Sequence, residues 1–378
     1  MKLKDWLICV AAALCIAAYL VAMPRYIDRG ISADPYREWI MPDKEGYTGI
    51  LSVWHIVGFK PYAGSGGEWL IARAKQLERK HYGVYVEVLS MSVEECEARL
   101  ARGENADIYS FPLGWGYAER FLPLQREFNG LKVGLHETGM QDGVLYAVPF
   151  MASGYALLIN TRLAQDRKVI LPEEGVSAAW LNDAAEKLTY ETGRNRKTKY
   201  QGLSGNAVAA ALLGANVPAA DYTVFQAQRA GLAVAELRAA GDLTRAQSAG
   251  KGFTFEALSL YRYTDLVQYL GVARGIDESK LPYAYEFLEL ALGEKAQTEL
   301  QLLCVFPVME LEGMHYEPAI VQKTYELLKD PVVPNAFLYQ RYKDALKDAA
   351  NRALNGDEAG KTELLARLEE LVNGREIK

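Results

Sequence analysis

The sequence predicts an α/β protein, and three of its features carry that prediction. Short apolar segments rich in β-branched and aromatic residues alternate with segments whose apolar residues recur at helical spacing. From residue 49 onward, the order strand, helix, strand, helix, strand is completed within about 60 residues, as expected for parallel strands joined by crossover helices. The chain has 378 residues, of which 50% are apolar, and this suffices for two domains of ordinary size.

The three strands of this first unit are predicted from runs that combine apolar character with high β propensity. They are GILSVW (49–54), VYVEVL (84–89) and DIYSF (107–111). Their order along the chain predicts a parallel arrangement, because each is separated from the next by a helical segment.

Two helices are predicted between these strands. In the first, Leu70, Ala74 and Leu77 recur at helical spacing, and charged residues occupy the opposite face. In the second, Ser92 is followed three positions later by Glu95, which is the pattern of a capping box at a helix start. Each of the first two strands is therefore followed by a helix that can cover the sheet.

The rest of the chain continues the alternation with a growing share of helix. The predicted elements are strands at 145–150, 154–160 and 263–275, a helix at 178–188, an alanine-rich helical region at 205–245, and mostly helical chain from 280 to the end. No internal repeat occurs at a regular spacing.

The amino terminus predicts export. Lys2 and Lys4 precede an apolar run over residues 6–23, which at about 18 residues is long enough to span a membrane and longer than most signal peptides require. Positive charge before the run predicts a cytoplasmic amino terminus and an extracytoplasmic body. We interpret residues 1–30 as a signal peptide or membrane anchor, with an uncleaved anchor favoured, and residues 31–47 as a tether.

The four cysteines indicate neither a lipid attachment site nor a defined disulfide. A bacterial lipidation signal needs small residues directly before the cysteine, but leucine precedes Cys15 and isoleucine precedes Cys9. Cys96 and Cys304 are the other two, and an exported protein could join them. Two cysteines so far apart in sequence are more often separate buried thiols, and we expect that here.

Charge argues against a nucleic-acid partner. The formal net charge is −6 and the isoelectric point is near 5.5. Non-specific binding to nucleic acid instead needs a basic surface that neutralises phosphates. The one basic run, GRNRKTK (193–199), is interpreted as a solvated loop.

Signatures of cofactor binding and catalysis are weak. The glycine-rich turn GSGGEW (64–69) between a predicted strand and a predicted helix matches neither the dinucleotide fingerprint nor the phosphate loop. The four histidines lack metal-ligand spacing, so no metal and no cofactor are predicted. Ser204 lies in GLSGN, which nearly matches a nucleophile elbow, but Asn206 occupies the position of the required glycine. The sequence therefore favours binding over catalysis.

Aromatic residues at strand ends favour a binding cleft. Trp54 ends the first predicted strand, Phe111 ends the third, and Trp115 lies just beyond it. Ligands of open α/β sheets bind beyond the carboxyl ends of the strands, where these rings are expected. Tyr155 and the pair Thr264-Asp265 lie in two further segments rich in aromatic and small residues. Aromatic faces with neutral hydrogen-bonding groups suit sugars.

Several segments resemble the extracellular solute-binding proteins of ABC importers, in their carbohydrate-type family 1 branch. The resemblance covers about residues 48–165 and 261–310, and its motifs are more specific jointly than singly. The matching segments are SVWHIVG, GSGGEWLIARAKQLERKHYGVYVEVLSMSVEECEARLARGENADIYSFPLGWG, GVLYAVPFMASGYALLINTRL, YTDLVQYLGVARGIDESKLPYAYEFLELAL and AQTELQLLCVFPV.

This resemblance implies a two-lobed, periplasmic-binding-protein-like (type II) fold with parallel-type sheets flanked by helices and a hinge between the lobes. It implies that residues 48–155 plus 264–312 form lobe I and that 156–263 plus 313–378 form lobe II. It also implies a small polar solute, a sugar or oligosaccharide, trapped in the cleft by hinge closure, with the membrane subunits of an ABC permease as partners.

Carried over position by position, the resemblance implies a set of cleft residues. The rings would stack on the ligand, Ser153 and Asp265 would hydrogen-bond to it, and Ser65 would donate from its loop. The complete predicted set is Trp54, Ser65, Phe111, Trp115, Ser153, Tyr155, Thr264 and Asp265.

Two other functions remain open at this point. One is a membrane-tethered ligand sensor or scaffold that has the same fold and no transport role. The other is an extracytoplasmic glycoside hydrolase, which would need two carboxyl groups facing each other across a pocket.

Overall fold

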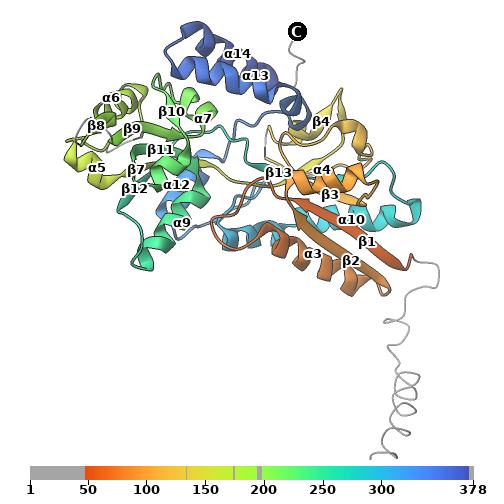
Figure 1. Cartoon of the computed structure of the whole chain (residues 1–378). Helices are drawn as coiled ribbons and strands as arrows, with labels where there is room; N and C mark the ends of the chain where they lie inside the picture. The colour runs from red at the N-terminus through yellow and green to blue at the C-terminus, as the bar shows by residue number, and fades with distance from the viewer. Residues whose placement is uncertain (1–46, 133, 173–174, 194–197, 374–378) are drawn as a thin grey trace, which may run out of the picture.

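The computed structural model describes residues 47–132, 134–172, 175–193 and 198–373. These residues form two large β-sheets flanked by helices (Figure 1) and one small sheet of two strands, β4 (Met140–Gln141) and β5 (Val144–Leu145). The predicted signal or anchor segment, 1–30, and all but the last residue of the predicted tether lie outside these residues. Across the described ranges, no helix is both long enough and apolar enough to cross a membrane.

The first sheet, which we call lobe I together with its covering helices, has five strands in the order β2-β1-β3-β13-β6. Strands β1, β2 and β3 are parallel, as predicted, and β13 runs antiparallel to both of its neighbours. Their bounds are β1 (Gly49–Ile56), β2 (Val84–Met91), β3 (Ile108–Pro112), β6 (Val148–Ala152) and β13 (Val267–Val272). The flanking helices include α3 (Gly66–Lys80), α4 (Val93–Ala101) and α10 (Leu281–Leu292).

The two helices predicted in lobe I form for the predicted reasons. Leu70, Ala74 and Leu77 are all buried on one face of α3, which packs against β2. At the start of α4, the Ser92 hydroxyl accepts a hydrogen bond of 3.2 Å from the backbone amide of Glu95. Both predictions are confirmed.

The second sheet, with its helices called lobe II, has six strands in the order β10-β9-β11-β7-β12, and β8 pairs with β9. The strands are β7 (Tyr155–Asn160), β8 (Tyr190–Thr192), β9 (Thr198–Gly205), β10 (Ala219–Ala220), β11 (Ala230–Glu236) and β12 (Phe255–Ser259). The helices are α5 (Thr161–Asp166), α6 (Ala178–Leu188), α7 (Ala207–Leu212), α8 (Tyr222–Gln226) and α9 (Leu237–Ser248).

The prediction of continuous helix over 205–245 is wrong. Strand β11 lies in the middle of this region and in the interior of the lobe II sheet. All of its residues except Glu236 are buried, so tertiary burial overrides the helix propensity of its alanines. Gly231 allows α6 to pack closely on this strand, because a Cβ there would lie 2.7 Å from the Leu188 side chain.

Three crossings between the lobes precede the last two helices of the described part of the chain. Residues 153–154 join β6 to β7, and residues 260–266 join β12 back to β13. The third crossing follows the bridge between Ala152 and Phe306 and leads to α12 (Ala319–Leu327), which packs on β7 and β12. The precise lobe boundaries implied by the resemblance stay a prediction.

Helix α13 (Ala336–Leu354) contacts both lobes. At its start, the Asn335 side chain donates hydrogen bonds to the backbone carbonyls of Glu137 (3.3 Å) and Met140 (2.7 Å), in lobe I. Its body packs against α7 of lobe II and against α14 (Glu358–Val372). Figure 1 shows α13 and α14, in blue, lying beside lobe II and reaching toward lobe I.

Candidate functional site

The carboxyl ends of three parallel strands meet at one edge of the lobe II sheet. Strands β9 and β10 both run parallel in this part of the sheet, and β11 is parallel to β9. Strand β7 runs the other way, so its first residue, Tyr155, lies opposite Glu236, the last residue of β11. Because ligands of open α/β sheets bind beyond carboxyl strand ends, this edge is the candidate site.

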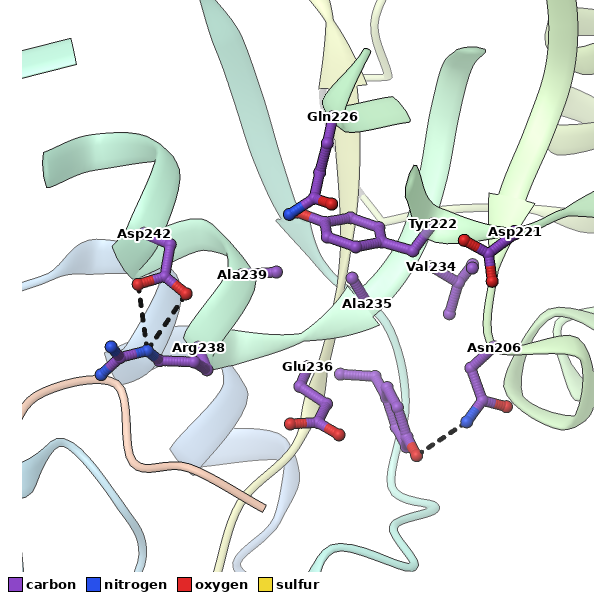
Figure 2. A pocket seen from close by; sticks show the side chains of 12 residues that line it. Asn206, Asp221, Tyr222, Gln226, Val234, Ala235, Glu236, Arg238, Ala239 and Asp242 are labelled. Atoms are coloured by element: carbon purple, nitrogen blue, oxygen red, sulfur yellow. Dashed lines mark hydrogen bonds and ion pairs between the residues drawn. The ribbon is translucent and has the colours of Figure 1, made fainter. Parts of the chain in front are cut away.

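A cavity of about 390 Å³ lies at this edge. Figure 2 shows side chains converging on it from β11, α8 and α9. The polar residues of its lining are Asn206, Asp221, Gln226, Glu236, Arg238 and Asp242, and the rings are those of Tyr155 and Tyr222. A second cavity, of about 540 Å³, shares Asn206 and Asp221 with the first and extends to Asp265 and Tyr339.

Four side chains form a hydrogen-bonded chain from the end of β9 through the crossing segments to α13. The Tyr155 hydroxyl donates to one oxygen of Asp265 (2.6 Å), and the Tyr339 hydroxyl donates to the other (2.8 Å). The side-chain amide of Asn206, at the end of β9, donates to the Tyr155 hydroxyl (2.9 Å). Burial, together with the negative charge of Asp265, raises the pKa of Tyr155, so this hydroxyl remains a donor.

Glu236 is the one carboxylate of the first cavity that makes no side-chain hydrogen bond or ion pair with a described residue. It is half-buried at the end of β11. Burial, followed by the negative charge of Asp265, raises the pKa of Glu236 to about 7. Figure 2 shows its carboxylate pointing away from the Ala235 side chain and separate from the Arg238–Asp242 pair.

The other charged side chains of this cavity are already engaged. The Arg238 guanidinium pairs with Asp242 at 3.0 Å and donates to the Pro61 carbonyl at 3.0 Å. Asp221 caps α8 by accepting from the backbone amide (2.8 Å) and hydroxyl (2.6 Å) of Thr223. These groups therefore have less free bonding capacity for a ligand than Glu236 has.

A loop of lobe I forms contacts across to lobe II. The backbone carbonyls of Pro61 and Tyr62 accept hydrogen bonds, each of 3.0 Å, from Arg238 and Arg245 of α9. A Cβ on Gly241 would lie 3.0 Å from the Tyr62 carbonyl oxygen, so glycine permits this close approach. The loop that precedes GSGGEW therefore rests on lobe II beside the candidate site.

Four of the predicted site residues lie together at the crossings. Ser153 lies in the first crossing segment and Tyr155 directly follows it, while Thr264 and Asp265 lie in the second. The Thr264 hydroxyl donates to the Ser153 carbonyl (2.7 Å), and the Ser153 amide donates to the Leu266 carbonyl (2.8 Å). Ser153 and Thr264 are thus buried and hydrogen-bond the two crossing segments to each other, while Tyr155 and Asp265 line the cavities.

The structure places the other four predicted residues away from these cavities. Ser65 is exposed at the start of α3. Trp54, Phe111 and Trp115 are 3%, 0% and 3% exposed within lobe I. They take part in an aromatic cluster in which, for example, Phe111 stacks on Phe121 with ring centroids 4.8 Å apart. Their stacking on a ligand stays a prediction, and their burial gives it no support.

Sequence reasoning missed most of the cavity. Asn206, Asp221 and Glu236 all fall in the region predicted as helix. A usable signal was present, because Asn206 and Asp221 are residue types that begin helices rather than continue them. Both do cap helices here, α7 and α8 respectively.

The structure also places the two cysteines and the serine that the sequence singled out. Cys96 is buried and Cys304 half-buried, and both are free thiols. Ser204 is fully buried, and its hydroxyl donates to the Leu232 carbonyl at 3.1 Å. Among the residues that the structure describes, no group of three or more His, Cys, Asp or Glu side chains is arranged to hold a metal ion.

Comparison with sequences gives no relative, whereas comparison with solved structures gives many. No family model matches the chain, and no curated protein sequence matches it. An ABC substrate-binding protein from Listeria monocytogenes in complex with cycloalternan is similar, with 14% identity and a TM-score of 0.59 over 86% of this chain and 99% of that one.

Two further structures show the same likeness. The cyclic alpha-maltosyl-1,6-maltose binding protein from Arthrobacter globiformis has 16% identity and a TM-score of 0.61 over 86% of this chain and 98% of its own. A Streptococcus pneumoniae solute-binding protein in complex with the blood group A-trisaccharide has 12% identity and a TM-score of 0.57 over 86% of this chain and 100% of its own. At these identities the likeness shows the fold, and it confirms that the chain has the predicted two-lobed, periplasmic-binding-protein-like α/β fold of sugar-binding ABC solute-binding proteins.

Proposed function

We propose that the chain is an extracytoplasmic solute-binding receptor of an ABC importer, which captures a sugar or oligosaccharide between its lobes. The observation that carries the proposal is the cavity at the carboxyl edge of the lobe II sheet, directly beside the crossing segments. It combines two tyrosine rings with amide and carboxylate groups, which suits a solute with apolar faces and many hydroxyls. Proteins with the same fold bind cycloalternan and a blood group trisaccharide.

The proposed mechanism is hinge closure. Tyr155 and Asp265 lie at the crossings, so a solute bound there contacts the segments that must bend when the lobes move. The Pro61–Tyr62 loop of lobe I reaches α9 on the other side of the site. A solute that bonds to both walls binds the closed arrangement more tightly, and that differential affinity shifts the population toward closure.

The proposed partners follow from the sequence. The apolar segment at 6–23 would hold the protein at the membrane, with its body outside the cytoplasm. There it would deliver solute to the permease subunits. A sensor or scaffold of the same fold would bind solute without supporting uptake, so solute uptake by a strain lacking this gene separates the two functions.

The binding proposal is tested by a thermal-shift screen of the full chain against sugars, oligosaccharides, amino acids, phosphates and polyamines. A solute at a hundred times its dissociation constant stabilises the folded state by about 2.7 kcal/mol, which is readily seen as a rise in melting temperature. We expect a sugar or oligosaccharide to give the largest rise. If no sugar shifts the transition and another class does, the carbohydrate proposal is wrong.

A glycoside hydrolase is the second candidate, and one observation favours it. Glu236 has a pKa raised to about 7, as a general acid requires, and Asp265 is close enough to contribute to that shift. Incubation with oligosaccharides, followed by chromatography of the products, tests it. Shorter products that depend on Glu236 would establish hydrolysis, and intact oligosaccharide after prolonged incubation would exclude it for those sugars.

A further inference from the structure

The candidate cavity has an excess of negative charge. Its lining carries three carboxylates, Asp221, Glu236 and Asp242, and one cation, Arg238. Arg238 pairs with Asp242, which also pairs with Arg245 of the same helix, outside the lining, and neither arginine pairs with Asp221 or Glu236. Asp221 and Glu236 have no cationic partner among the described residues.

The groups that face Glu236 from neighbouring elements do not supply the missing cation. Across the sheet it faces Tyr155, and from the second crossing segment it faces Asp265, whose negative charge adds to its own. Both oxygens of Asp265 accept from tyrosine hydroxyls rather than from a cation. Lys343 and Lys347 line only the adjoining cavity, and the Lys343 amine donates to Gln340 at 3.0 Å.

We infer that the solute of this cavity carries a protonated amine that lies against Glu236, as in an oligosaccharide that contains amino sugars. This inference rests on the proposed function and narrows its solute class. An ammonium group supplies three hydrogen-bond donors and the missing positive charge, whereas a hydroxyl supplies one donor and no charge. Hydrogen bonds between charged partners are also about twice as strong as neutral ones.

Aromatic rings in the same wall favour the same solute. Tyr155 and Tyr222 both line the cavity beside Glu236. A sugar ring can pack its apolar face on a tyrosine, and an ammonium group over the face of such a ring is attracted by the quadrupole. Rings and carboxylate together can therefore hold the sugar and the amine of one solute.

The test compares two oligosaccharides that differ in charge. The full chain in detergent is titrated calorimetrically with the β-1,4-linked trimer of D-glucosamine and with its fully N-acetylated counterpart. At about pH 7 and low salt, where charge interactions are little screened, we expect the glucosamine trimer to bind at least about tenfold more tightly. The same titrations are made with Glu236→Gln and with Glu310→Gln, a control at an exposed carboxylate outside this cavity.

The readout is the ratio of the two dissociation constants. We expect Glu236→Gln to bring the ratio to within about threefold of one, while Glu310→Gln leaves it as in the unaltered chain. A glutamine at 236 keeps the shape of the side chain and removes only a charge without an ionic partner, so the variant should fold, and circular dichroism checks this.

Two outcomes separate this inference from the function on which it rests. If neutral or acetylated sugars bind as tightly as the glucosamine trimer, or if Glu236→Gln leaves the ratio unchanged, the amine inference is overturned and the sugar-receptor proposal stands. If no sugar of any charge binds, the proposed function itself fails.

Discussion

The hydroxyl of Tyr155 donates a hydrogen bond of 2.6 Å to the carboxylate of Asp265, which is 110 residues away in the sequence. Tyr155 begins the first strand of lobe II, and Asp265 lies where the chain returns to lobe I. The bond therefore ties together the two segments on which the lobes would hinge. Because Tyr155 and Asp265 also line the cavities, one interaction connects the proposed hinge with the candidate binding site.

Replacing Tyr155 by phenylalanine should weaken both the fold and binding. The partly buried carboxylate of Asp265 loses one of its two donors, and we expect the free energy of unfolding to fall by about 1–3 kcal/mol. Urea denaturation measures this, and Tyr82→Phe is the control because that ring is 63% exposed. Equal stability of both variants would show that the hydroxyl is dispensable.

Replacing Trp115 by alanine should destabilise the fold. The ring is 3% exposed, its indole nitrogen donates to Glu97 at 2.9 Å, and it packs in the aromatic cluster of lobe I. We expect a loss of about 3–5 kcal/mol in the free energy of unfolding, as for other large aromatic side chains removed from a core. A stable variant with solute binding weakened at least about tenfold would instead support the ligand-stacking role predicted from the sequence.

Glu236 should make stability depend on pH. Its pKa is raised from 4.5 to about 7 in the folded protein, so the folded state binds this proton more tightly than the unfolded state does. Its contribution is fully present below about pH 4.5 and is lost as the pH rises through 7. Above pH 7, Glu236→Gln should therefore be more stable than the unaltered chain by about 1–2 kcal/mol, after allowance for solvent screening of a half-buried group.

This prediction is checked by urea denaturation of both proteins at about pH 4 and about pH 8. The difference between them should be near zero at the acid end and appear only at the alkaline end. Glu256→Gln, at an exposed carboxylate of lobe II, is the control. A constant difference at both pH values would mean that Glu236 does not titrate as described.

Replacing Arg245 by glutamine should loosen the contact between the lobes. The variant loses the hydrogen bond of 3.0 Å to the Tyr62 carbonyl, which joins α9 to the lobe I loop. We expect a larger radius of gyration in small-angle X-ray scattering, because fewer bonds favour the closed arrangement. Arg352→Gln is a matched control, since that side chain pairs within α13 and α14. An unchanged radius would show that this bond has no part in closure.

The sequence was sufficient to predict a helix or a strand where the local pattern and the tertiary environment favour the same element. Helix α6 has the bounds predicted for it, because its apolar residues face one side and Ser177 caps it. Strand β11 was missed, because its alanines have high helix propensity and only burial inside a sheet makes them a strand. That error concealed Glu236, which occupies the last position of the strand.

The candidate site was predicted only in part, because tertiary burial again decides what the local sequence pattern does not show. Tyr155 and Asp265 were found because the segments around them resemble those of a family that uses such crossings. Trp54 and Phe111 were placed at the correct strand, but sequence does not state which face of a strand is covered. In the structure both faces of these strands are covered, so the rings pack inside lobe I.

Helix α13 has a consequence for how far the lobes can move. Asn335 fixes its first turn to lobe I, while the rest of the helix lies along α7 of lobe II. A large change in the angle between the lobes would have to bend α13 or break its contacts with one of the two lobes. If the lobes close on a solute as proposed, α13 should therefore limit the motion to a small change of the angle between them.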